Sequence, residues 1–212
     1  MSFSTKSYNN KFQLIKKHRK AVFLLLFLFF SMNINAQKSK CISGDCNNGY
    51  GKKAYHNETY TGNFKNQLKH GKGKIIWKNN RFRSYQGDFK DGKITGFGTM
   101  IYSNGDKYIG QIRVGYRNGK GTYISRSGSK YVGDFKNDII EGKGTLTYPD
   151  GDKYTGDFKD NTLNGKGVYL YSNGTKYIGE FVDGNFHGYG TYYLEYGDVY
   201  HEGQFKNGEP IY

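Results

Sequence analysis

The two cysteines are the residues whose chemistry is most open in this sequence. Cys41 and Cys46 lie five positions apart, and such thiols could bind a metal ion, react as nucleophiles or form a disulfide. A zinc site needs four ligands, and His56, the nearest imidazole, has no second histidine beside it. In a chain with an export signal, which residues 1–36 indicate, the pair favours a Cys41–Cys46 disulfide. The bridge would close a very short loop and staple the chain only locally.

Histidines and acids do not form a recognisable catalytic set. His70 and His187 hold the same position in a repeated pattern, immediately before a Gly-x-Gly motif. A recurring position is the opposite of a unique catalytic one. The acids also recur in one row, formed by Asp88, Asp134, Asp157 and Glu180. Because no nucleophile, base and orienting group stand apart from the repeat, we expect no enzyme activity, no cofactor and no small-molecule substrate.

One pattern recurs along most of the chain. A Tyr-x-Gly core, usually followed by x-Phe, starts every 23 residues, with one interval of 25 residues between the first two copies. The tyrosines and glycines are Tyr60/Gly62, Tyr85/Gly87, Tyr108/Gly110, Tyr131/Gly133, Tyr154/Gly156 and Tyr177/Gly179. The Phe positions are Phe64, Phe89, Phe135, Phe158 and Phe181, with Ile112 in the third copy. Gly-x-Gly motifs follow at Gly71/Gly73, Gly96/Gly98, Gly119/Gly121, Gly142/Gly144, Gly165/Gly167 and Gly188/Gly190. Internal repetition at such a period predicts a repeat architecture.

This unit resembles the MORN (membrane occupation and recognition nexus) repeat, and the resemblance covers about three quarters of the chain. It implies contact with phospholipid head groups or membranes. The lipid kinase and lysine methyltransferase domains that accompany similar repeats elsewhere are absent from this sequence. The glycines could alternatively form phosphate-binding loops, but such a loop needs a helix after the glycines. No helical pattern follows any of the six motifs, so the glycines are interpreted as structural.

The repeats predict an all-β fold. Tyr154, Gly156 and Phe158 fall on alternate positions, which is the strand period, and Asn-Gly or Asp-Gly turns follow. Each repeat is therefore expected to be a β-hairpin in an elongated, twisted antiparallel sheet. Folding the strands about Gly105 and its equivalents pairs Ile101–Ile109, Ile124–Val132, Thr147–Thr155 and Leu170–Ile178, and places Gly121, Gly144 and Gly167 opposite Phe135, Phe158 and Phe181, with Gly98 opposite Ile112.

The chain divides into four segments. Residues 1–36 have a basic start, an apolar run over 21–30 and Ala36, which predict a cleaved secretory signal peptide, because the run is too short to span a bilayer. Residues 37–59 hold the cysteines and a degenerate first repeat, 60–199 hold six repeats, and 200–212 form a half repeat that caps the array. Two extra residues within 79–84 are expected to lengthen one turn. The protein is expected to be exported, to the periplasm, the outer membrane or the medium.

Charge helps to choose between two classes of function. The formal net charge of +14 falls to about +8 once residues 1–36 are removed, which gives no case for nucleic acid. Lysines and acids alternate on the face opposite the Tyr-Gly-Phe set, and this favours a scaffold that binds a protein partner or itself over a phospholipid-binding module. The candidate contact surface consists of Ile101, Ile109, Ile124, Val132, Leu170 and Ile178. The candidate basic row consists of Lys107, Lys130, Lys153 and Lys176.

Overall fold

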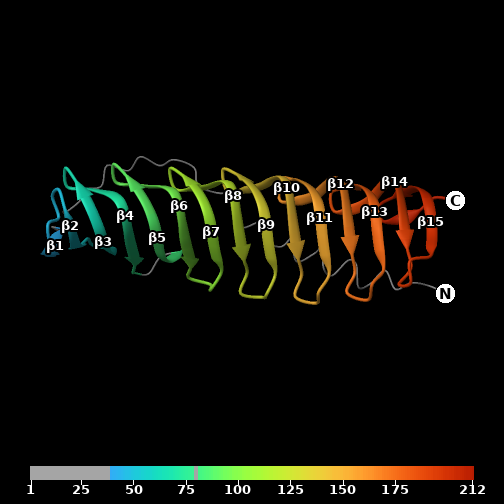
Figure 1. Ribbon diagram of the computed structural model, residues 1–212, viewed down its shortest axis with the longest axis horizontal. Coiled ribbons are helices and arrows are strands. Elements are labelled where there is room, and N and C mark those ends of the chain that lie inside the picture. The colour runs from blue at the N-terminus through green and yellow to red at the C-terminus, as the bar shows by residue number, and fades with distance from the viewer. Residues whose placement is uncertain (1–38, 79–80) are drawn as a thin grey trace, which may run out of the picture. The chain divides into compact units, whose positions relative to one another are not determined.

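The computed structural model describes residues 39–78 and 81–212, which form one open antiparallel sheet of 16 strands. Each strand pairs with the strands that precede and follow it in the sequence, so the hairpins succeed one another along the sheet (Figure 1). The signal peptide proposed for residues 1–36 lies outside the described part, and so do Asn79 and Asn80 of the segment 79–84 that was expected to lengthen one turn. The strands are β1 (Lys40–Gly44), β2 (Tyr50–Ala54), β3 (Glu58–Lys65), β4 (Leu68–Trp77), β5 (Phe82–Lys90), β6 (Lys93–Tyr102), β7 (Lys107–Arg113), β8 (Tyr116–Ile124), β9 (Lys130–Lys136), β10 (Ile139–Thr147), β11 (Lys153–Lys159), β12 (Thr162–Leu170), β13 (Lys176–Val182), β14 (Asn185–Tyr193), β15 (Val199–Lys206) and β16 (Glu209–Pro210).

The all-β prediction is confirmed. No strand pair closes the sheet on itself within the described residues, and these residues contain no helix. Over the same ranges there is accordingly no helix long and apolar enough to cross a membrane.

Each hairpin from β3–β4 to β15–β16 closes through a two-residue turn. In the turn between β9 and β10, Asn137 and Asp138 both have positive φ angles, of 49° and 70°. Positive φ at both central residues matches the right-handed twist of the flanking strands, and Asn, Asp and Gly tolerate it best. Val114, at the equivalent position between β7 and β8, has a φ of 50°. A β-branched residue in this region is strained.

Replacing Val114 with asparagine is expected to stabilise the protein by about 1 kcal/mol, because asparagine adopts positive φ at lower cost. The Val114 side chain is 54% exposed, so little packing is lost. In a domain of this size the melting temperature should rise by about 2–4 °C. The reciprocal change Asp183→Val, at the same turn position with a φ of 49°, should lower it by a similar amount. Equal melting temperatures for Val114→Asn and the wild type would contradict the assignment of strain.

From β6 onward, successive hairpins are joined by three-residue turns, and these set the register. In the turn after β6, the Gly105 amide donates to the Tyr102 carbonyl (3.1 Å) and the Tyr102 amide donates to the Asp106 carbonyl (2.9 Å). Gly105, with φ 96°, is the last residue of the loop, the arrangement of a tight turn followed by a glycine bulge. The hairpin is therefore centred on Asn104 and not on Gly105.

Because the hairpin is centred here, the cross-strand pairs expected from the sequence are wrong. Each residue pairs with one that lies two positions from its expected partner. Ile101 pairs with Lys107, Ile124 with Lys130 and Leu170 with Lys176. Ile109, Val132 and Ile178 pair across these turns with Thr99, Thr122 and Val168, and Thr155 pairs with Thr145. Because the shift is even, every side chain stays on the face expected for it.

The core consists of tyrosine rings that lie over glycines. Gly144 pairs with Gly133 and with Gly156, and Phe158 pairs with Gly142, so the expected position of the Phe residues opposite the second glycine of each motif is wrong. A Cβ atom built on Gly144 would lie 2.5 Å from Cε2 of Tyr131, whose ring therefore occupies the space that a side chain would fill. The Tyr131 hydroxyl donates to the Asp134 carbonyl (3.1 Å).

Aromatic rings join neighbouring hairpins along this face. The Tyr131 ring meets those of Phe135 and Phe158 edge-on, with centroids 5.2 and 5.1 Å apart. Such pairs stabilise by about 0.5–1.5 kcal/mol beyond the area they bury. The same contacts recur from hairpin to hairpin, for example from Tyr154 to Phe158 and Phe181. Each repeat therefore completes the core of its neighbour.

The cysteine pair lies at the first strand. The structure joins Cys41 and Cys46 as a disulfide with Cα atoms 5.9 Å apart, a separation that suits such a bridge. Gly44 pairs with Gly51, which in turn pairs with Gly62, so the segment continues the glycine row. Cys46 packs against the core at the position that the Phe residues hold in later repeats.

Protein purified without reductant is expected to leave both Cys41 and Cys46 unmodified by an alkylating reagent, since a disulfide carries no thiolate to react. Mass spectrometry before and after reduction measures this: two labels should appear only after reduction. Quantitative labelling of the unreduced, folded chain would show that the cysteines are free.

Candidate interaction surface

The sheet has two unlike faces. We call the face that carries the buried tyrosines, such as Tyr131 and Tyr154, the inner face, and the opposite face the outer face. Side chains alternate between the two faces along each strand. The cross-strand partners then define three parallel rows of side chains on the outer face, and these rows contain all the candidate contact residues.

The first row, here the lysine row, unites the two sets that the sequence suggested separately. Ile101 is paired with Lys107, Lys107 with Ile124, and Ile124 with Lys130. The row consists of Ile101, Lys107, Ile124, Lys130, Thr147, Lys153, Leu170, Lys176 and Tyr193. Within the described ranges no carboxylate oxygen lies within 4.0 Å of the four ammonium groups. The Lys176 ammonium lies 4.4 Å from the centre of the Tyr193 ring, a cation–π contact.

The second row, the β-branched row, lies two residues from the lysine row on every strand, on the side of the glycines. It consists of Thr99, Ile109, Thr122, Val132, Thr145, Thr155, Val168, Ile178 and Thr191. The side chains of Val132 and Ile178 are 44% and 41% exposed. The hydroxyls of Thr145 and Thr155 lie 3.1 Å apart and bond to each other. A row of β-branched residues of this length gives the outer face a flat, partly apolar strip.

The third row, the ion-pair row, contains the acids. Its members include Lys72, Asp88, Phe97, Gln111, Lys120, Asp134, Lys143, Asp157, Lys166 and Glu180. The ammonium–carboxylate distances are 2.6 Å for Lys72–Asp88, 2.7 Å for Lys120–Asp134 and 2.7 Å for Lys143–Asp157. The hydrogen bond from Lys143, opposed by desolvation, holds the pKa of Asp157 below its ordinary value. The acids thus neutralise the lysines of their own row and leave the lysine row uncompensated.

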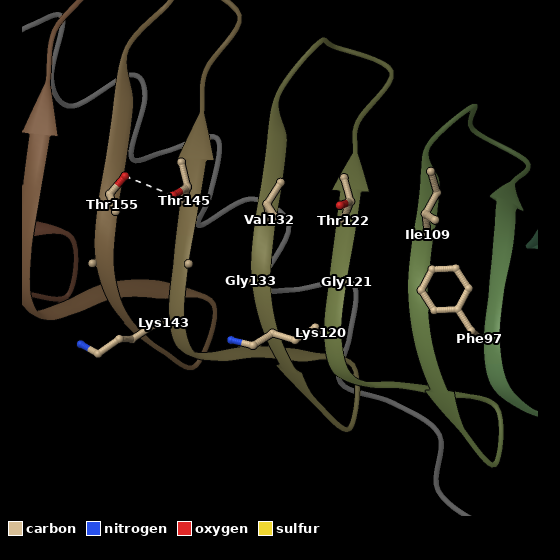
Figure 2. A pocket seen from close by; sticks show the side chains of 12 residues that line it. Phe97, Ile109, Lys120, Gly121, Thr122, Val132, Gly133, Lys143, Thr145 and Thr155 are labelled. Carbon is tan, nitrogen blue, oxygen red and sulfur yellow. Dashed lines mark hydrogen bonds between the residues drawn. The ribbon is translucent and has the colours of Figure 1, made fainter.

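A groove of about 650 Å³ runs between the β-branched row and the ion-pair row (Figure 2). Ile109 and Val132 lie on one side of the glycine line, and Phe97, Lys120 and Lys143 belong to the row on the other side. Ile109 and Val132 are the two predicted contact residues that line the groove. Ile101, Ile124, Leu170 and Ile178 lie on the same face outside it.

Sequence reasoning missed Phe97, Thr122 and the lysines of the ion-pair row. Phe97 stands at the x position of Gly96-x-Gly98, where the other repeats have Lys72, Lys120, Lys143, Lys166 or Tyr189. The alternation of side chains already assigns that position to the face opposite the glycines. The signal was therefore present in the repeat pattern.

No group of three or more His, Cys, Asp or Glu side chains within the described residues could hold a metal ion. His70 Nδ1, on β4, lies 3.5 Å from Oδ1 of Asp91 in the turn between β5 and β6, and the two side chains are 33% and 67% exposed. Burial raises the pKa of Tyr60 to about 12, so this hydroxyl stays protonated near neutral pH. What the geometry provides is an extended surface with regularly spaced apolar and cationic groups.

Comparison with known proteins identifies the repeat. The MORN repeat family model matches residues 60–80, 85–107, 108–130, 131–153, 154–176, 177–198 and 201–210. A 54-residue stretch is 46% identical to MORN repeat-containing protein 3 of Xenopus laevis and covers 24% of this chain and 22% of that protein. A solved structure, the SAS-4 TCP domain of Drosophila melanogaster in complex with a proline-rich motif of Ana2, aligns over 82% of this chain and 96% of that one, with 11% identity and a TM-score of 0.49. Because the family model covers more than half of the residues, the chain belongs to the MORN repeat family.

Proposed function

We propose that the protein is a non-catalytic scaffold of the cell envelope that binds a protein partner through its outer face. MORN repeats generally serve as interaction modules. The observation that carries the proposal is the partly exposed β-branched row between two charged rows, with Val132 44% exposed. An apolar strip of this kind with a polar border is typical of protein-binding surfaces.

Export to the envelope is part of the proposal. The basic start, the apolar run and Ala36 support a cleaved signal peptide. A bridged Cys41–Cys46 pair suits an oxidising compartment. Intact-mass analysis of protein recovered from its native host should give a chain that begins at Gln37.

A second candidate function, binding of anionic phospholipid, is favoured by the lysine row. Four ammonium groups, on β7, β9, β11 and β13, have no carboxylate partner among the described residues and alternate across the strands with Ile124, Thr147 and Leu170. Basic residues near an anionic membrane surface each contribute about 1 kcal/mol of attraction. The ion-pair row, however, carries carboxylates on the same face, beyond the β-branched row and about 13 Å from these lysines, and they weaken the attraction.

A photo-crosslinking residue on the outer face separates the two functions. Placed at Val132, it should crosslink to protein in intact cells, whereas the same residue at Tyr196, a 90% exposed turn residue, should not. Co-sedimentation with vesicles of phosphatidylglycerol, against phosphatidylcholine vesicles, measures lipid binding. Crosslinks to protein with weak vesicle binding support the scaffold. Tight binding to phosphatidylglycerol without crosslinked protein would replace the scaffold by the lipid function.

A further inference from the structure

We propose that the protein partner is a second copy of this chain, with two outer faces packed against each other about a two-fold axis along the β-branched row. This inference rests on the proposed function, because it uses the same surface. Its basis is the charge pattern of the outer face: the two-fold axis places lysines of one copy opposite acids of the other copy.

The pattern occurs on the first strand of successive hairpins. On β9 the outer-face residues in order are Lys130, Val132 and Asp134. The equivalent residues are Lys153, Thr155 and Asp157 on β11, and Lys176, Ile178 and Glu180 on β13. Each strand thus presents a cation, a β-branched side chain and an acid, with about 13 Å between the cation and the acid. Figure 1 shows these strands in order along the sheet, with β10 and β12 between them, and the cross-strand pairs place their charged residues in continuous rows.

A two-fold axis along the β-branched row reverses the strand direction between copies and keeps the strand order. Lys130 then lies opposite Asp134 of the partner subunit. In the same way, Lys153 lies opposite the partner's Asp157, and Lys176 lies opposite the partner's Glu180. Because the interface is isologous, each pairing occurs twice. The alternative in-plane axis, parallel to the strands, would place lysine row against lysine row, which like charges disfavour.

The apolar and geometric requirements of such an interface are also met. In this arrangement the β-branched rows meet each other, and stacked sheets of this kind pack about 10 Å apart. The groove of about 650 Å³ beside the row leaves space for the partner's side chains. From β6 to β14 the face measures about 40 Å by about 20 Å, or about 800 Å² per copy, which is what a stable interface needs.

The excess of lysines on this face does not prevent the association at physiological salt. Lys107 lies opposite Gln111 of the partner subunit and remains unneutralised. Asp134 and Asp157 are each shared between a lysine of their own chain, Lys120 or Lys143 at 2.7 Å, and the opposed lysine of the partner subunit. At about 0.15 M ionic strength the Debye length is about 8 Å, so distant cations repel weakly while opposed pairs still attract. The experiments below therefore use that ionic strength.

A mixing experiment tests the charge pattern. The wild-type mature chain should be a dimer by light scattering after size exclusion. Lys130→Glu/Lys153→Glu should be a monomer, and so should Asp134→Lys/Asp157→Lys, because each places like charges opposite each other. An equimolar mixture of the two variants should recover the dimer. As a control, Lys136→Glu/Lys159→Glu makes the same charge change on the same strands outside the three rows and should remain dimeric.

A crosslinking measurement covers the case in which the aspartate variant does not fold, since Asp134 and Asp157 also accept backbone hydrogen bonds from Lys143 and Lys166 (both 3.2 Å). A residue on a two-fold axis meets its own copy. Val132→Cys should therefore form an interchain disulfide under mild oxidation. Val182→Cys is the matched control, because Val182 is also a valine on a first strand and is also 44% exposed, but lies outside the rows.

Two results would overturn the inference: a wild-type chain that is monomeric at about 100 µM, well above the micromolar range of weak complexes, or equal crosslinking of Val132→Cys and Val182→Cys. A monomer whose Val132 position still crosslinks to a different envelope protein would overturn self-association and leave the proposed function standing. A monomer without any protein crosslink would overturn both.

Discussion

Replacing Gly144 with alanine is expected to destabilise the protein by about 3 kcal/mol, the upper part of the range for overpacked cores. The added Cβ would lie 2.5 Å from both Cε2 and the hydroxyl oxygen of Tyr131. That ring is 2% exposed and is held by Phe135 and Phe158, so it has no free space into which to move. In an ordinary strand the same change stabilises by about 0.5–1 kcal/mol, because glycine is entropically unfavourable there. Urea unfolding followed by circular dichroism measures the difference.

A double-mutant cycle isolates the contact between the ring and the glycine. Tyr131→Ala alone should cost about 3–5 kcal/mol, as large core truncations do. In that background Gly144→Ala should cost close to nothing, because the ring that opposes the Cβ is gone. The coupling energy between the two sites should then be about 2–3 kcal/mol, as expected for residues in direct contact. An equal cost of Gly144→Ala in both backgrounds would show that the glycine is needed for another reason.

The period-2 alternation within a 23-residue repeat was sufficient to predict the strands, the hairpins and the face of each side chain. It is insensitive to a shift of two residues, because an even shift keeps every residue on its face. The register depends on how many residues the turn contains. Sequence shows a glycine at position 105 but not that it ends a three-residue loop, a fact carried by the Tyr102–Gly105 hydrogen bond.

The sequence predicted which residues belong to the candidate surface but not how they are arranged on it. Lys107 and Ile124 were assigned to separate sets, although they are cross-strand neighbours in a single row. The acids were expected to neutralise the lysine row. They instead pair with lysines on the second strand of the preceding hairpin, as in Lys120–Asp134, because Asp134 lies beside that strand. Such contacts depend on the register, which sequence alone did not determine.

The last repeat shows another limit of prediction from sequence, because a histidine replaces the buried tyrosine there. His201 occupies the position of the buried tyrosines and meets Phe205 edge-on at 5.0 Å, as the tyrosines meet their phenylalanines. The hydroxyl of Tyr177 reaches the carbonyl of Glu180 at 3.1 Å. The shorter imidazole leaves His201 Nε2 buried without a hydrogen-bond partner among the residues described. The alignment of repeats reveals the substitution but not this loss.

Asp152→Ala is expected to destabilise the protein by about 2–4 kcal/mol, because buried hydrogen bonds to a charged acceptor are lost and their donors stay buried. Asp152 is 5% exposed. One carboxylate oxygen accepts the Tyr169 hydroxyl at 2.9 Å, and the other accepts the Ser172 amide at 3.0 Å. Asp152 lies in the turn before β11, whereas Tyr169 lies on β12 and Ser172 in the turn that follows β12. The carboxylate therefore joins one repeat to the following one.

The repeat itself supplies the control for this second prediction. Ser129 holds the position equivalent to Asp152, since its carbonyl accepts the Ser125 amide as the Asp152 carbonyl accepts the Tyr148 amide. Ser129→Ala should change the free energy of unfolding by less than about 0.5 kcal/mol, the usual range for surface substitutions. Asp152→Asn, which retains an oxygen acceptor, should recover part of the loss. If Asp152→Ala and Ser129→Ala unfold at the same urea concentration, the carboxylate does not hold the repeats together, and their cohesion comes from the backbone strand pairing and the edge-on aromatic contacts.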